Sequence, residues 1–219
     1  MKSVMEYLTE RALSTKVVEL IDMPELLSAI RLQNEENVEK YLAQGANPNI
    51  MGSFGKNALM TACDAVDANL NIIKTLVAHG ADINFKDAYG DTMIHLLVLN
   101  PNNLDVIKYL VSEGLKVNIE NHNGVEPIVY AVRRGLVEEV KYLLEEGANP
   151  NAVDVRKNPL LHIVAIEASD TDLSNSALIS MVNLLIDKGT KKTKNRDGFY
   201  PYELIYDNPE IRKYMENIK

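Results

Sequence analysis

A short glycine-centred pattern recurs along the 219-residue chain at nearly constant spacing. It reads GANPN at 45–49, GADIN at 80–84, GLKVN at 114–118, GANPN at 147–151 and, in degenerate form, GTKKT at 189–193. The successive glycines are 35, 34, 33 and 42 residues apart. A period of about 20–50 residues is the sequence signature of stacked repeats, so it constrains the fold more strongly than composition does.

An apolar stripe precedes each of these glycines. Apolar side chains stand seven, four and three positions before it, as Val140, Leu143 and Leu144 do before Gly147. This spacing places them on one face of a helix. The glycine then follows the last turn, where a left-handed residue ends a helix at least steric cost. We therefore expect Gly147 to have a positive φ.

Each unit also contains an earlier helical segment and a turn-rich stretch. The segments 57–63, 92–98, 126–132 and 159–165 are small and apolar, which predicts a second helix per unit. The stretches before most of them contain a glycine in a tight turn, which indicates a short β-hairpin. One unit cannot bury its own apolar stripe, so the units are expected to stack into a solenoid.

These features resemble the ankyrin-repeat family. The likeness rests on the G-A-[ND]-x-N loops, the [DN]-x-x-G turns and remnants of a T-P-L-H helix start, in which Thr92, His95 and His162 match the motif. The resemblance implies an all-α repeat solenoid of stacked helix-turn-helix units with short β-hairpin loops, about five to six repeats including caps. It also implies a binding scaffold, although a fold alone does not name a partner.

The pattern predicts where the units begin and end. Residues 1–21 are expected to form an N-terminal helical cap and residues 194–219 a C-terminal capping repeat, on either side of ankyrin repeats at 22–193. The repeats are predicted at about 22–49, 50–84, 85–118, 119–151 and 152–193. In the last of these, the polar sequence ASDTDLSNS at 168–176 predicts a surface loop, which is either a partner contact or a drifted loop.

Composition excludes several classes of function. A formal net charge of -8 argues against nucleic acid as a partner. No segment approaches the roughly 18 consecutive apolar residues of a membrane-spanning helix. A cytoplasmic monomer is therefore expected. Richness in Asn, Ile and Lys indicates an AT-rich genome, which suggests a host-directed effector delivered into a host cell cytosol as a further possibility.

The residues capable of catalysis have structural interpretations. His95 and His162 occupy helix starts two repeats apart, too far to share a metal, and Cys63 lies in an apolar helix where a buried role is expected. The basic run from Lys188 to Arg196 is interpreted as a solvated loop, with an acidic partner or an anionic surface as the alternative. The sequence thus predicts no enzyme, no metal and no cofactor. A structural spacer and, less favoured, an enzyme or enzyme-regulatory subunit stay as alternatives.

The predicted function is recognition of a protein partner by the concave face of the solenoid. In the family, hairpin tips and the first helices form that face. Phe54, Tyr89 and the arginines are residue types enriched at interface hot spots. Beside them, an exposed apolar patch is expected from Met51, Val125, Val153 and Val155. The predicted site comprises Met51, Phe54, Lys56, Lys86, Tyr89, Asp91, His122, Val125, Arg133, Arg134, Val155 and Arg156.

Overall fold

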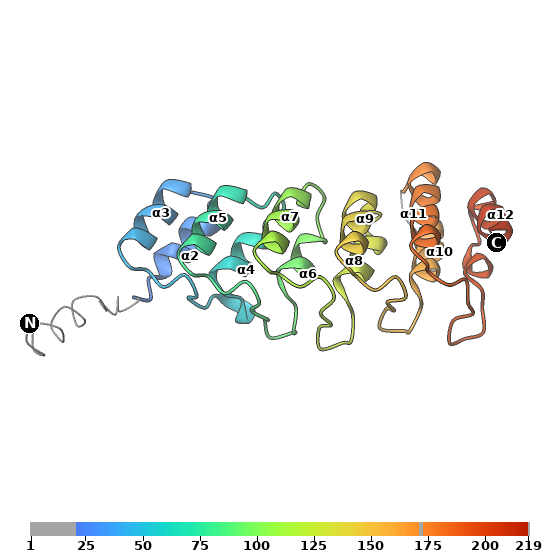
Figure 1. The fold of residues 1–219 in the computed structure, drawn as a ribbon, viewed down its shortest axis with the longest axis horizontal. Helices are drawn as coiled ribbons and strands as arrows, with labels where there is room; N and C mark the ends of the chain where they lie inside the picture. Colours follow the sequence, from blue (N-terminus) through green and yellow to red (C-terminus); the bar gives the residue numbers. More distant parts are fainter. Residues whose placement is uncertain (1–20, 171–172, 219) are drawn as a thin grey trace, which may run out of the picture.

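The computed structural model describes residues 21–170 and 173–218, and the predicted N-terminal cap at 1–21 lies outside these ranges except for Ile21. Helices follow one another in pairs, which stand side by side in a row (Figure 1). The pairs are α2 (Pro24–Arg31) with α3 (Glu35–Ala43), α4 (Ala58–Cys63) with α5 (Leu70–Ala78), α6 (Met93–Leu97) with α7 (Leu104–Ser112), α8 (Pro127–Arg133) with α9 (Val137–Glu145), α10 (Leu160–Asp170) with α11 (Asn175–Asp187), and the short 3-10 helix η2 (Pro201–Leu204) with α12 (Pro209–Asn217). The first helix of each pair packs on the first helices of its neighbours, and among the second helices α3 packs on α5, α5 on α7, α9 on α11 and α11 on α12. The architecture is the predicted all-α repeat solenoid.

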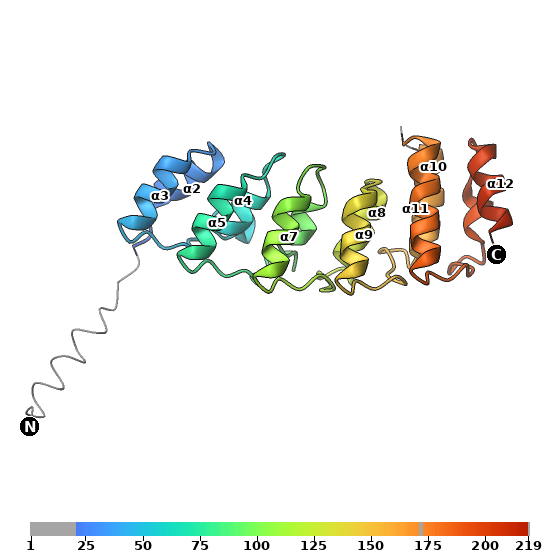
Figure 2. The ribbon, with the colours of Figure 1, turned by 45° about the horizontal axis from the view of Figure 1, so that its top comes forward.

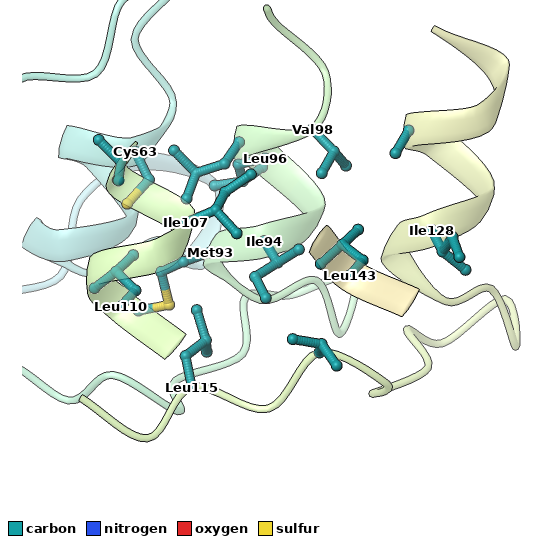
Figure 3. Close-up of a cluster of buried hydrophobic side chains, with 14 of the residues drawn as sticks. Cys63, Met93, Ile94, Leu96, Val98, Ile107, Leu110, Leu115, Ile128 and Leu143 are labelled. Atoms are coloured by element: carbon teal, nitrogen blue, oxygen red, sulfur yellow. The ribbon is translucent and has the colours of Figure 1, made fainter. Parts of the chain in front are cut away.

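The apolar stripes of the second helices form the centre of the stack. Val38, Ile73, Ile107, Val140 and Val182, which occupy equivalent positions before the repeat glycines, are all fully buried. Figure 3 shows how side chains from α6, α7 and neighbouring helices meet in this core. Cys63 is among them, and burial raises the pKa of its thiol, which confirms its interpretation as a core residue.

The loops between pairs all project from one edge of the row (Figure 1) and fold into a recurring five-residue turn, which we call a finger. Four fingers, at 87–91, 121–125, 154–158 and 195–199, begin with Asp or Asn. The side-chain oxygen of this first residue accepts hydrogen bonds of 2.8–3.2 Å from the backbone N–H groups of the third and fifth residues. Such a side chain holds the backbone in a turn by itself.

The fourth residue of each of these fingers has a positive φ. It is glycine in three of them, and Lys157 adopts the same conformation with φ 65° in the fourth. The finger at 52–56 begins instead with Gly52 and contains the short 3-10 turn η1 (Ser53–Gly55), in which Phe54 has φ 59°. Gly147 has φ 92°, as expected of a glycine that ends a helix. In the described part of the chain, isolated antiparallel bridges such as Met51 with Asn57 take the place of longer strands.

The predicted surface loop at 168–176 is wrong for residues 168–170 and 175–176, which are helical, and its residues 171–172 lie outside the described part of the chain. Helix α10 continues to Asp170 and α11 already begins at Asn175, where the Ser174 side chain accepts a hydrogen bond from the Ala177 N–H. The extra residues mostly lengthen these two helices, which extend further than the other pairs in Figure 2. The physical reason is that Ala168 is buried and Leu173 packs against Gly135 of the preceding pair, so this polar-looking segment contributes to the core.

Histidines join two of the first helices to the next finger along the chain. Nε2 of His95 lies 3.2 Å from the Val125 carbonyl oxygen, while its Nδ1 accepts a hydrogen bond from the Thr92 N–H at 3.0 Å. Nε2 of His162 lies 2.9 Å from the Phe199 carbonyl oxygen in the same way. Burial lowers the pKa of both imidazoles, so the neutral form suits these positions.

The two histidines differ at their second ring nitrogen. Nδ1 of His162 is buried and has no hydrogen-bond partner. Pro159 stands where Thr92 stands in the other unit, and proline offers neither an N–H nor a hydroxyl. A buried acceptor left without a donor costs about 1–3 kcal/mol.

Gly90 is expected to tolerate substitution less than Gly198, although both have a positive φ. A Cβ on Gly90 would lie 2.8 Å from the His122 backbone nitrogen, whereas nothing lies within 4 Å of one on Gly198. Both changes to alanine incur the strain of a left-handed residue, about 1–2 kcal/mol. Gly90→Ala should lower the free energy of unfolding by at least about 1 kcal/mol more, because the finger contact must also open. Urea denaturation of both variants measures this difference, and equal losses would show that neighbouring fingers do not restrain each other.

Pro159→Thr should stabilise the protein by supplying His162 with the missing donor. We expect a gain of about 1 kcal/mol in the free energy of unfolding, reduced by the flexibility that the unfolded chain regains without proline. Met60 occupies the position equivalent to His162 in the second pair, so His162→Met is the natural control background. If Pro159→Thr stabilises that background equally, the gain does not come from the ring nitrogen.

Candidate functional site

The candidate site is the surface formed by the fingers and the first helix of each pair, which corresponds to the predicted concave face. We call it the finger face. Neighbouring fingers contact each other along it: the His122 N–H donates to the Tyr89 carbonyl at 2.9 Å, and Ala88 packs against Gly55. These contacts order the fingers into a continuous edge, so that equivalent positions form rows across the repeats.

The third position of each finger forms one such row, occupied by Phe54, Tyr89, Asn123, Arg156 and Asp197. The Phe54 side chain is 73% exposed and that of Tyr89 is 58% exposed. Because their two fingers are in contact, the two aromatic side chains lie on adjacent parts of the same edge. An aromatic pair left in solvent by a folded chain is typical of a contact surface rather than of a core.

Two hollows lie on the finger face, one near each end of the row. The first has a volume of about 240 Å³ and is lined by Arg31, Ser53, Phe54, Lys56, Thr61 and Asp64. Within it, Lys56 Nζ lies 2.8 Å from Asp64 Oδ2, so this cation is already paired. The second has a volume of about 300 Å³ and is lined by Arg156, Asn158, Ile166, Ser169, Asn195, Asp197, Leu204 and Tyr206.

The prediction that Val125 is exposed is wrong, since it is only 2% exposed. It occupies the fifth position of its finger, where its N–H closes the turn on Asn121 Oδ1 and its side chain joins the core. Asp91, at the same position, is only partly exposed and accepts a hydrogen bond from Asn121 Nδ2 at 2.8 Å. Position five therefore attaches the finger to the stack, and the predicted apolar patch shrinks to Met51 and Val155, with Val153 half-buried.

The predicted basic residues of the site have different surroundings. Arg133 spans the joint to the next unit, with nitrogens 3.6 Å from both Asp154 Oδ2 and Glu167 Oε1. Lys86 donates through Nζ to the carbonyl of Glu120, directly before the next finger, at 3.1 Å. Arg134, Arg156 and His122 are exposed. The structure thus assigns Arg133 and Lys86 to the repeat joints and leaves the other three to solvent.

Three lysines of the C-terminal basic run contact their own chain, although Lys188 and Lys194 are exposed, as the interpretation of a solvated loop requires, and Lys192 is half-buried. Lys192 donates through Nζ to the carbonyls of Glu216 and Ile218, both at 2.8 Å, at the end of α12. Lys188 Nζ lies 3.8 Å from Glu145 Oε1, and Lys194 Nζ lies 5.2 Å from the centre of the Tyr200 ring. Cations near the end of a helix interact favourably with its carbonyls.

The sequence predicts Ile166 on the concave face but gives no indication of the other two apolar residues of the second hollow, Leu204 and Tyr206. Tyr206 is 76% exposed, and Leu204 and Ile166 line the same hollow. Tyr206 lies in the segment 194–219, which is predicted only as a C-terminal capping repeat. The exposed position follows from the short η2, which ends at Leu204 and leaves Tyr206 beyond it, with its N–H donating to Ser169 Oγ at 3.3 Å.

Within residues 21–170 and 173–218, no group of three or more His, Cys, Asp and Glu side chains is placed to hold a metal ion. None of the helices described there is long and apolar enough to cross a membrane.

The family model for ankyrin repeats in three copies matches residues 26–121 and 95–196. The chain is 29% identical over 197 residues to human SH3 and multiple ankyrin repeat domains protein 2. The aligned region covers 89% of this chain and 10% of that protein. It is 30% identical over 142 residues to a putative ankyrin repeat protein of Acanthamoeba polyphaga mimivirus, covering 64% of this chain and 18% of the relative. Among solved structures, the ankyrin repeat domain of Bcl-3, a member of the IkappaB family, superposes with a TM-score of 0.70 at 21% identity, covering 88% of this chain and 81% of that one.

The chain therefore belongs to the ankyrin-repeat family, a fold that serves as a general protein–protein interaction module and is typically non-catalytic. It spans only about a tenth to a fifth of the length of these curated relatives.

Proposed function

We propose that this chain is a non-catalytic protein-interaction module that binds one partner protein through its finger face. The observation that carries the proposal is the exposure of Phe54 and Tyr89 at the same position of two contacting fingers. Neither ring belongs to the buried core, so the repeat stack does not need them. Large aromatic side chains on an ordered edge are suited to anchor a partner at low cost in conformational entropy.

The neighbouring residues support the same surface. Met51, directly before the Phe54 finger, and Val155, on the finger at 154–158, are exposed apolar side chains, and Arg134, Arg156 and His122 add polar and charged contacts. Such a mixture of an aromatic centre and a polar rim resembles the usual anatomy of a protein interface. A structural spacer would have no use for exposed aromatic finger residues. A monomeric state, cytoplasmic location and host-directed role stay predictions from the composition.

Replacing both Phe54 and Tyr89 with alanine should abolish partner binding and leave the fold intact. Exposed residues outside the core change the free energy of unfolding by less than about 0.5 kcal/mol each. Loss of an aromatic anchor weakens binding by about 2 kcal/mol or more, which corresponds to about thirtyfold. The partner is captured from a lysate with the intact chain and identified, and its affinity for both forms is then measured by calorimetry.

The control removes equally exposed apolar side chains away from the finger tips. Leu32 and Val66 follow the ends of α2 and α4 and are 79% and 69% exposed. Leu32→Ala with Val66→Ala should leave the affinity unchanged. If instead this control loses the partner while the Phe54 and Tyr89 variant retains it, binding lies on the edge opposite the fingers and the proposal is wrong.

A further inference from the structure

Glu126 places a carboxyl group where two other units have a shorter polar side chain. It stands directly before α8, at the position that Asn57 and Thr92 occupy before α4 and α6. Both of those side chains make hydrogen bonds within the first turn of their helix. The Glu126 side chain caps nothing and is turned instead toward the loop at 147–151, which follows α9. Helix capping therefore does not account for this glutamate.

The Glu126 side chain is buried with a single hydrogen bond. The residue is 7% exposed, and its Oε1 accepts a hydrogen bond from Asn149 Nδ2 at 3.1 Å. Its Oε2 is buried and has no hydrogen-bond partner. In the described part of the chain Glu126 forms no ion pair. An ionised carboxylate at this position loses its hydration for one amide donor, which disfavours the charged form.

The surroundings of Glu126 act on its ionisation in the same direction. Burial raises the pKa of Glu126. The hydrogen bonds with Asn149 oppose this increase but are the smaller effect, and the negative charge of Glu120 adds to it. Two acidic groups and one amide thus meet at this position without a cation of their own.

The cationic and titratable groups of the neighbouring elements are directed elsewhere. Lys157 Nζ, on the next finger, approaches the same point beside the finger glycine at 121–125 as Glu120 Oε2, at 3.9 and 3.7 Å. From the preceding pair, His95 Nε2 faces the Val125 carbonyl oxygen at 3.2 Å, and burial lowers the pKa of this imidazole, so it is neutral there. Neither group pairs with the Glu126 carboxylate.

The loop that Glu126 contacts connects two helix pairs. Thr190 Oγ1 donates to the Pro150 carbonyl at 2.7 Å, and the Lys191 N–H donates to Asn151 Oδ1 at 3.3 Å. Through these bonds the loop at 147–151 joins the α8–α9 pair to the loop that follows α11. The contact with Asn149 fastens the same loop to the start of α8.

We propose that Glu126 is a pH-responsive latch in this joint, closed on Asn149 when its carboxyl group is neutral and loosened when the group ionises. The neutral acid still offers an acceptor oxygen to Asn149 and leaves no charge in the joint. The latch lies outside the row of finger tips and is independent of the proposed function.

The sign of the pH dependence follows from the direction of the shift. Because the pKa of Glu126 is higher in the folded chain than in the unfolded chain, the folded chain holds this proton more tightly. Its contribution to stability is fully present below the ordinary pKa of glutamate, roughly 4.3. That contribution is lost as the pH rises through the higher pKa of the folded chain.

Glu126→Gln tests the latch, because the amide keeps an acceptor oxygen for Asn149 and cannot ionise. Urea denaturation of the full chain and of this variant between pH 4.5 and 8 gives the ratio of their unfolding constants, wild type over variant. This ratio should rise with pH, tenfold for each unit by which the pKa of Glu126 is raised, and then level off. The titrations of His95 and His162 occur in both proteins and cancel in the ratio.

Two further variants serve as controls. Glu139 of α9 is similarly buried, at 8% exposed, but neither of its oxygens is a buried atom without a partner. The ratio for Glu139→Gln should therefore not change with pH. Glu120→Gln removes the second negative charge, so the loss of stability should begin at a lower pH than in the wild type.

Two direct readouts complete the test. Amide hydrogen exchange at 147–151, corrected for its intrinsic pH dependence, should slow on acidification in the wild type and not in Glu126→Gln. A carbon-13 titration of the Glu126 carboxyl group in the unmodified chain measures its ionisation without any substitution. A ratio that does not change with pH, an equal rise for Glu139→Gln, or a carboxyl group that ionises at or below the ordinary value would each overturn the inference.

Discussion

The apolar stripe of each helix pair is buried only because another pair covers it. A single pair on its own would leave an apolar face in contact with water. Within the row the neighbouring pairs cover that face, and Ile73, Ile107 and Val140 are fully buried. Stability in such a stack comes from contacts between neighbours, and each joint must therefore be specific. The ends of the row are the places where this constraint is relieved, and there the units depart from the pattern: a finger without the Asp or Asn at one end and a one-turn 3-10 helix at the other.

The fingers are held in place mainly by hydrogen bonds rather than by apolar packing. An Asp or Asn at the first position satisfies two backbone N–H groups, so the turn needs little help from packing. The fifth residue attaches the finger to the stack, as Val125 does when its carbonyl faces His95. The side chain at the third position takes no part in holding the turn. Phe54, Tyr89 and Arg156 can therefore occupy this position without disturbing it. A row of side chains that vary on a constant backbone turn follows directly from this division of tasks.

Much of the fold could be predicted because it depends on local spacing. Stripes at i, i+3 and i+4 followed by glycine define a helix and its end, and the period of about 33 residues then requires stacking. The helix lengths around 168–176 could not be predicted, because most residues of that segment are polar and indicate a loop. Ala168 and Leu173 are the exceptions, and they pack only because the preceding pair lies beside them. The predicted exposure of Val125 was wrong for a related reason. The sequence of a hairpin turn does not say which side of the turn the neighbouring helix covers.

The sequence by itself determined the class of architecture, the core stripes and the exposure of Phe54 and Tyr89, since these follow from period, helix geometry and the position of each turn glycine. Only the tertiary structure decided which cations stay unpaired, where the two hollows lie and why Nδ1 of His162 lacks a donor. Each of these depends on side chains from different units, such as Arg133 with Asp154 or Arg156 with Tyr206. Local spacing specifies one helix at a time, whereas a surface made by several repeats exists only after they have packed.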